Sequence, residues 1–203
     1  MRIFVGIDLE ESIRMKIARL VEGASSFAPD AHWVTAESLH VTLKFIGEQK
    51  PEQVDAIAQR LGQIKANALE IRFSSHGFFP TPKAPRVFWI GIQAGPELAA
   101  LAASVDAAAA DLGIAREERA YSPHLTLARA GGRSGDPKWR KGDGPSPVFT
   151  ILQKRLAAMG ELDFGTMTAG EFVLYQSQLS PKGSKYTKLQ RFALQRATAP
   201  DTR

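Results

Sequence analysis

The feature that most constrains this chain is a four-residue pattern that occurs twice. Residues 40–43 read His-Val-Thr-Leu, and residues 124–127 read His-Leu-Thr-Leu. Such alternation is typical of a β-strand with one buried face, because successive side chains of a strand point to opposite faces. Each strand would place an imidazole and a hydroxyl on one face and two aliphatic side chains on the other. The repeat predicts two similar lobes whose motif strands face each other across a cleft.

The spacing of apolar residues elsewhere predicts a mixture of strands and helices. We expect strands at 2–8, 40–46, 69–79, 86–92, 124–128, 171–178 and 186–194, and helices at 10–21, 51–64, 96–112 and 147–159. Gly77 should interrupt the third strand, and residues 180–184 should form a hairpin turn. Because strands and helices alternate irregularly, the predicted fold class is α+β.

Length and local composition bound the domain organisation. The 203 residues suit one compact unit, so residues 1–197 are assigned to a single domain and residues 198–203 to a frayed tail. Residues 131–147 are rich in glycine, proline and charge, which predicts a long exposed loop in which Trp139 could pack or contact a ligand. No uncharged apolar run approaches about 18 residues and no secretory signal begins the chain, so no membrane partner is expected. We expect a monomer.

Composition excludes several kinds of chemistry. The chain has no cysteine, which excludes disulfides, thiolate metal sites and a cysteine nucleophile, and makes a cytoplasmic location the natural expectation. The net charge of +5 favours anionic partners, although a solubilising surface charge explains it equally well.

The two motifs carry the side chains that in-line displacement at a phosphodiester needs. Imidazole titrates near neutral pH, so His40 and His124 can be one neutral and one charged. A neutral ring can take a proton from attacking water while the charged ring gives one to the leaving oxygen, which predicts a bell-shaped rate profile near neutral pH. The hydroxyls of Thr42 and Thr126 can donate to the non-bridging oxygens.

Other types of site fit the sequence less well. Neither motif has a carboxylate cluster or a His-x-x-x-His spacing nearby, so no metal and no cofactor are expected. The Gly-x-Ser-x-Gly pattern of a serine hydrolase is missing. A single His-Val-Thr-Leu sequence usually belongs to an ordinary strand. Two copies in a chain with four histidines favour a catalytic role, but the spacing alone leaves the structural alternative open.

The two motifs and several other segments resemble a known family. Paired His-x-Thr motifs mark the two-histidine (2H) phosphoesterase superfamily, and this chain is similar to its RNA 2',3'-cyclic phosphodiesterases, also called 2'-5' RNA ligases. The similar segments are residues 2–7, 33–34, 39–48, 79–80, 85–89, 123–129 and 177–180, with Tyr186 and Leu189. The resemblance implies a bilobal α+β fold with two pseudo-symmetric lobes, antiparallel sheets lining a central cleft, and helices outside.

The resemblance also implies an activity and roles for residues. The activity is hydrolysis of a terminal 2',3'-cyclic phosphate to a 2'-phosphomonoester without a metal, on RNA ends or small cyclic nucleotides. Carried over, His40 is the proton donor and His124 the proton acceptor, while Thr42 and Thr126 hold the phosphate. The alternatives are a 2'-5' RNA ligase, a 2'-5' or nucleotide cyclic phosphodiesterase of the same superfamily, or a non-catalytic RNA-binding module. The 131–147 loop is longer than is usual, which bears on substrate preference.

Four further residues are candidates for substrate binding. Lys44 shares the strand parity of the first motif's His and Thr, so it could attract an anion, or could be a solvated lysine. Arg129 has the parity of the motif's leucines and would point away from the phosphate unless the strand bulges. Arg86 and Tyr186 match family positions but could simply pack.

The remaining histidines and two aromatic residues have plainer interpretations. His32 and His76 belong to no repeated pattern and are expected to be structural. Phe45 and Trp89 are expected to belong to the core rather than to stack on a base.

Overall fold

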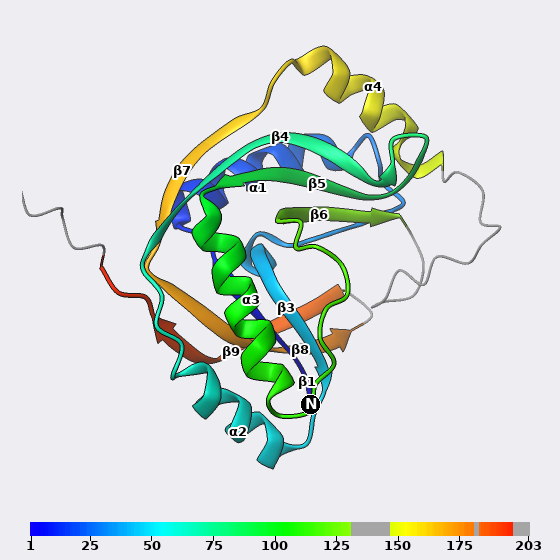
Figure 1. Cartoon of the computed structure of the whole chain (residues 1–203). Coiled ribbons are helices and arrows are strands. Elements are labelled where there is room, and N and C mark those ends of the chain that lie inside the picture. The colour runs from blue at the N-terminus through cyan, green and yellow to red at the C-terminus, as the bar shows by residue number, and fades with distance from the viewer. Residues whose placement is uncertain (131–146, 181–182, 197–203) are drawn as a thin grey trace, which may run out of the picture.

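Two antiparallel β-sheets form the frame of the molecule (Figure 1). The computed structural model describes residues 1–130, 147–180 and 183–196. The first sheet has the strand order β3-β1-β8-β9 and the second has the order β2-β6-β5-β4-β7. The strands are β1 (Arg2–Asp8), β2 (Ala31–Trp33), β3 (His40–Glu48), β4 (Leu69–Thr81), β5 (Ala84–Ala94), β6 (His124–Ala130), β7 (Asp163–Ala169), β8 (Glu171–Ser180) and β9 (Gly183–Ala193).

Four α-helices are present in the described part of the chain. They are α1 (Glu11–Ser25), α2 (Pro51–Leu61), α3 (Pro96–Ala110) and α4 (Thr150–Met159), with 3-10 turns η1 (Ala36–Ser38) and η2 (Pro147–Phe149). The α+β class and the two antiparallel sheets are confirmed. None of the helices among the described residues is long and apolar enough to cross a membrane.

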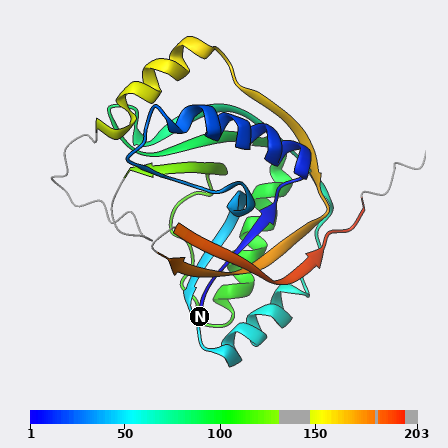
Figure 2. The ribbon, with the colours of Figure 1, turned by 180° about the vertical axis from the view of Figure 1, so that it is seen from behind.

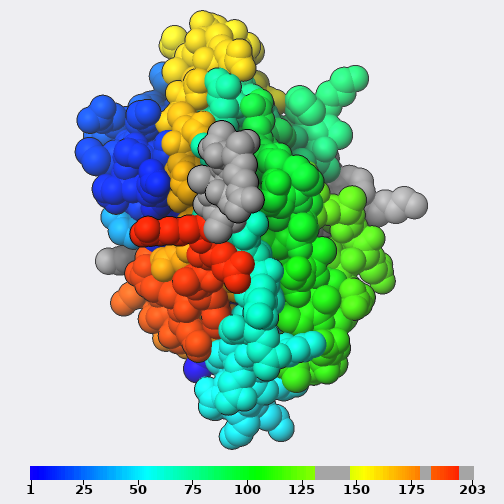
Figure 3. All heavy atoms as spheres, turned by 60° about the vertical axis from the view of Figure 1, so that its left-hand side comes forward, coloured from blue at the N-terminus to red at the C-terminus, as the bar shows by residue number. Residues whose placement is uncertain are grey.

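Each lobe includes an element from the half of the chain that forms most of the other lobe. β2 comes before β3 in sequence but pairs with β6 in the second sheet. Helix α1 contacts β2 and β7 of that sheet (Figure 2), while α3, from the other half of the chain, packs on β3 of the first sheet. In the space-filling view, α2 (cyan) lies against α3 (green) beside this first sheet (Figure 3). One contiguous cluster of buried apolar side chains, which includes Val41 and Leu125, therefore joins both lobes.

Some expectations lie outside the described residues or differ from the structure. The tail at 198–203 and residues 131–146 with Trp139 are not described, and the single domain at 1–197 stays a prediction. The hairpin expected around 180–184 is confirmed by the antiparallel pairing of β8 with β9. The strands β2 and β7, which form the two edges of the second sheet, were not predicted.

The predicted break at Gly77 is wrong. β4 runs unbroken through Gly77. The irregularity nearest to it in the pairing with β5 lies at Ser75, which has φ 60° and is skipped. Gly77 instead makes room for the ring of Trp89, because a Cβ built on it would lie 2.1 Å from Trp89 Cζ2.

We expect Gly77→Ala to lower the free energy of unfolding by about 1–3 kcal/mol, because the added methyl overlaps a packed ring. Urea unfolding measures the effect. Gly23→Ala in α1 is the matched control, since nothing lies within 4 Å of its Cβ position and alanine favours a helix. Equal stability of the two variants would contradict the packing role of Gly77.

Candidate active site

His40 opens β3 directly after the turn η1 and lies among aromatic rings. Its strand partner in β1 is Asp8. The neighbouring Gly6 leaves room for the imidazole, because a Cβ there would lie 3.4 Å from His40 Cδ2 and 2.9 Å from a backbone carbonyl oxygen. The ring centroid is 4.6 Å from that of Phe4 and 5.1 Å from that of Tyr186, which stands edge-on to it. His40 is therefore fixed in position and largely shielded from water.

The two motif histidines are held in the same way. Nδ1 of His40 lies 2.8 Å from the carbonyl oxygen of Ser38, and Nδ1 of His124 lies 2.8 Å from the carbonyl oxygen of Ser122. A carbonyl oxygen only accepts hydrogen bonds, so in both rings Nδ1 carries a proton and donates it. Nε2 is then the nitrogen of each ring that can give or take a proton.

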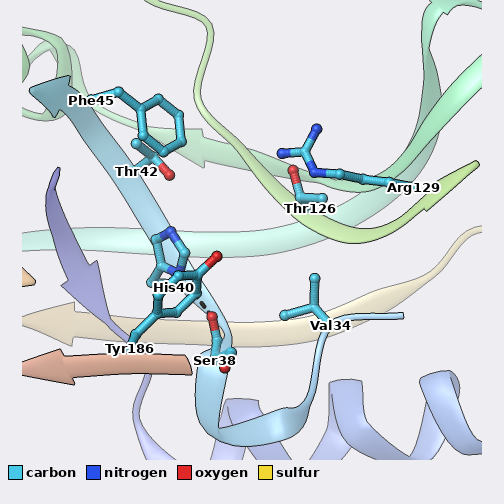
Figure 4. A pocket seen from close by; sticks show the side chains of 8 residues that line it. All are labelled: Val34, Ser38, His40, Thr42, Phe45, Thr126, Arg129 and Tyr186. Atoms are coloured by element: carbon cyan, nitrogen blue, oxygen red, sulfur yellow. Dashed lines mark hydrogen bonds between the residues drawn. The ribbon is translucent and has the colours of Figure 1, made fainter. Parts of the chain in front are cut away.

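A small pocket lies between β3 and β6. His40 and Thr42 line it from β3, and Thr126 and Arg129 line it from β6 (Figure 4). The other lining residues are Val34, Ser38, Phe45 and Tyr186. The structure thus brings both threonines and one histidine to a single pocket.

His124 is not one of the lining residues. It precedes Thr126 by two positions on β6, so both side chains share a strand face. Its ring stands edge-on to Phe79, with centroids 4.9 Å apart. His124 therefore lies next to the pocket rather than in its wall.

A β-bulge follows the threonine in each motif. In the β1–β3 pairing Leu43 is skipped, and in the β5–β6 pairing Leu127 is skipped. An extra residue reverses the alternation of the side chains that follow. The bulges are the local reason why Phe45 and Arg129, at the same place in the two repeats, both reach the pocket.

Arg129 was expected to point away unless the strand bulged, and the bulge is present. Phe45 was expected in the core, which is wrong, since its side chain is 62% exposed and lines the pocket. Its position two residues after the leucine, matching Arg129, was the available signal in the sequence.

Lys44 does not face the pocket, and its predicted contact with an anionic substrate is wrong. The same bulge turns it to the other side of β3, where it is 7% exposed. Its Nζ donates to Oδ1 of Asp106 at 2.5 Å and to the carbonyl oxygen of Ala115 at 3.0 Å. Lys44 therefore joins β3 to α3 and to the connection that follows it.

The other sequence candidates lie in different places. Tyr186 lines the pocket and stands edge-on to His40. Arg86 lies on β5 and is not among the lining residues. His76 is half-buried against Phe88, with ring centroids 6.3 Å apart, and His32 is exposed on β2.

Burial sets the protonation of both motif histidines. It lowers the pKa of His40 to about 4, although the Ser38 carbonyl and the Asp8 carboxylate act in the opposite direction. Burial also lowers the pKa of His124, against the effect of the Ser122 carbonyl. The Arg129 guanidinium lowers the pKa of both rings, so its charge is close enough to act on each. Both imidazoles are neutral at pH 7 in the free protein.

These pKa directions predict an acidic pH optimum. If one ring must be protonated and the other neutral, kcat/KM peaks between the two pKa values, falling at high pH as the acid deprotonates and at low pH as the base protonates. We expect the optimum between about 4 and 6.5, the ordinary histidine value, rather than near neutrality. NMR titration of the imidazole C2–H signals measures the two pKa values directly. Values near 6.5 for both rings would contradict this.

Residues suited to a metal do not come together around these strands. In the described ranges, no three side chains of the metal-ligating types, His, Asp and Glu, are grouped so that they could hold an ion.

Comparison with known proteins identifies the family. A family model described as LigT like Phosphoesterase matches two consecutive stretches, residues 7–89 and 90–186, each of which contains one motif. The RNA 2',3'-cyclic phosphodiesterase of Archaeoglobus fulgidus is 34% identical over 192 residues, covering 95% of this chain and 99% of that protein. The protein of the same name from Methanothermobacter thermautotrophicus is 29% identical, covering 95% and 98%.

A solved structure supports the same assignment. E. coli LigT complexed with 3'-AMP matches with a TM-score of 0.71 and 28% identity, covering 95% of this chain and 97% of that chain. Sequence and fold agree along nearly the whole chain. The chain therefore belongs to the LigT-like phosphoesterases, a family of the two-histidine phosphoesterase superfamily.

Proposed function

We propose that this protein hydrolyses terminal 2',3'-cyclic phosphates of RNA to 2'-phosphomonoesters, without a metal ion. The observation that carries the proposal is the pairing of two matched half-sites, each with an imidazole locked through Nδ1 and a threonine two residues further on. Relatives named RNA 2',3'-cyclic phosphodiesterase support the substrate, and E. coli LigT structures complexed with 3'-AMP and with phosphate support a nucleotide pocket.

In the proposed reaction, Nε2 of His124 takes a proton from water as its oxygen attacks phosphorus. The bond from phosphorus to the 3' oxygen breaks, and Nε2 of His40 gives that oxygen its proton, which leaves the phosphate on the 2' oxygen. The direction of the two roles follows the family resemblance. Because burial lowers the pKa of His40 to about 4, its protonated ring is a strong acid that only part of the protein carries at the working pH.

The pocket residues suit the charge that develops in this reaction. The hydroxyls of Thr42 and Thr126 and the guanidinium of Arg129 can donate hydrogen bonds to the non-bridging phosphate oxygens. The exposed ring of Phe45 offers a face on which the terminal base can stack. Each of these groups lines the same pocket.

The test is to incubate the protein with a short RNA that ends in a 2',3'-cyclic phosphate and to identify the phosphomonoester. We expect a 2'-phosphate, at the same rate with and without EDTA. A 3'-phosphate, or inhibition by EDTA, would contradict the proposed mechanism. Turnover of 2'-5'-linked dinucleotides alone would favour the alternative 2'-5' phosphodiesterase. Binding without cleavage would favour an RNA-binding module.

A further inference from the structure

The connection between α3 and β6, residues 111–123, is fastened to the strand of the first motif. It runs beside β3 before it enters β6 (Figure 1). The hydroxyl of Tyr121 donates to the carbonyl oxygen of Thr42 at 3.0 Å, and Lys44 Nζ donates to the carbonyl oxygen of Ala115 at 3.0 Å. The segment that leads into the second motif is therefore bound to the first motif at two points.

Tyr121 is well suited to this contact. It lies three residues before His124 and packs its ring against the core. Burial raises the pKa of the phenol above its ordinary value of 10.0, which keeps the hydroxyl protonated and able to donate. β3 is an edge strand of its sheet, so Tyr121 provides Thr42 with a hydrogen bond that a neighbouring strand would otherwise make.

A reciprocal contact ties the second motif to the segment before the first. The backbone N–H of Val34, which lies between β2 and η1, donates to the carbonyl oxygen of Leu127 at 2.8 Å. Val34 also lines the pocket. Each motif strand is thus held by the segment that leads into the other motif.

We propose that Tyr121 is a positioning residue that keeps the two half-sites at the separation needed for both histidines to act on one phosphorus. This rests on the proposed function. Thr42 and Thr126 reach the phosphate from opposite strands, and the two proton transfers occur in the same transition state. A small change in the separation of the strands therefore lowers the rate of reaction more than it weakens binding of the substrate, which either strand still contacts.

The variant Tyr121→Phe removes only the hydroxyl. We expect kcat on cyclic-ended RNA to fall about tenfold, a size that small misplacements of reacting groups can cause, while KM stays within about twofold, as expected when an interaction acts mainly in the transition state. Ile57→Val is the control, because Ile57 is 1% exposed in α2, a helix that packs on α3, and its loss of a methyl lowers stability without removing the hydrogen bond to Thr42. An unchanged kcat for Tyr121→Phe, or an equal fall in both variants, would overturn the proposal.

A second measurement does not depend on turnover. With only four histidines in the chain, the C2–H signals of His40 and His124 can be assigned and followed as inorganic phosphate is added. In the wild type we expect both signals to move along one binding curve, and in Tyr121→Phe we expect the His124 shift to shrink relative to that of His40. Identical titrations would overturn the role of Tyr121. A wild type that binds phosphate but turns over no cyclic-ended RNA would overturn the proposed function alone.

Discussion

His40→Ala and His124→Ala are each expected to lower kcat on cyclic-ended RNA by about 10²–10⁴-fold, the usual contribution of a general acid or base. In each ring Nδ1 is bound to a backbone carbonyl, so Nε2 is the nitrogen that can exchange a proton, and the alanine substitution removes it. Steady-state kinetics at the pH optimum measures the loss. His32→Ala is the control, since His32 is exposed on β2 and does not line the pocket.

The nature of the leaving group separates the two roles. A phosphodiester with a nitrophenol leaving group needs little help from a proton donor, because nitrophenolate is a far weaker base than a sugar alkoxide and departs without being protonated in the transition state. We expect such a substrate to restore much of the rate of His40→Ala but little of the rate of His124→Ala, because only the acid becomes dispensable. Restoration of His124→Ala instead would reverse the assignment of acid and base. Full activity of either alanine variant on RNA would contradict two-histidine catalysis.

The parts of the fold that sequence could predict are those with long local patterns. The helices α1, α2 and α3 and the strands β1, β3, β5 and β8 follow from apolar residues at helical or alternating spacing, and the repeated motif identified β3 and β6 as matched elements. The repeat also predicts that the two sheets face each other, because two similar half-sites must lie close together to act on one substrate.

The two strands that were not predicted, β2 and β7, have no such local pattern. β2 has only three residues, which is too short to show a period. In β7 the glycine at position 165 has φ 98°, and the pairing with β4 skips a residue between Gly165 and Asp163. Both strands owe their conformation to neighbours that are remote in sequence, β6 and β4, so tertiary pairing rather than local preference decides them.

The site was predictable as far as the bulges. His40, Thr42 and Thr126 precede the bulges, and alternation places their side chains correctly on the cleft face. After Leu43 and Leu127 the alternation of the side chains reverses. As a result Phe45, expected in the core, lines the pocket, while Lys44, a candidate for substrate binding, is buried on the other side of β3. The role of Tyr121 could not be predicted from a sequence motif. Its partner is a backbone carbonyl oxygen of the other lobe, and every residue type supplies that atom.

Lys44→Met is expected to destabilise the protein by about 3–5 kcal/mol, the usual effect of removing one member of a buried ion pair. The side chains of Lys44 and Asp106 are 6% and 17% exposed. Burial by itself would raise the pKa of Asp106, but the hydrogen bonds from Lys44 and from the backbone N–H of Glu117 hold it below its ordinary value. Without Lys44 a largely buried carboxylate stays charged at neutral pH, and among the described residues Arg116, 3.7 Å away, is the counter-ion that remains. Urea unfolding at pH 7 measures the loss.

The double variant Lys44→Met/Asp106→Asn tests the cause of that loss. Asparagine keeps an oxygen that can accept from Glu117 but carries no charge, so we expect the double variant to be more stable than Lys44→Met alone. KM for cyclic-ended RNA should match the wild type in both variants, because Lys44 faces α3, whereas Arg129→Ala should raise KM if its guanidinium binds the phosphate. A raised KM in Lys44→Met with unchanged stability would indicate that Lys44 contacts the substrate. It would also mean that the side chains of β3 keep their regular alternation beyond Leu43 when RNA is bound.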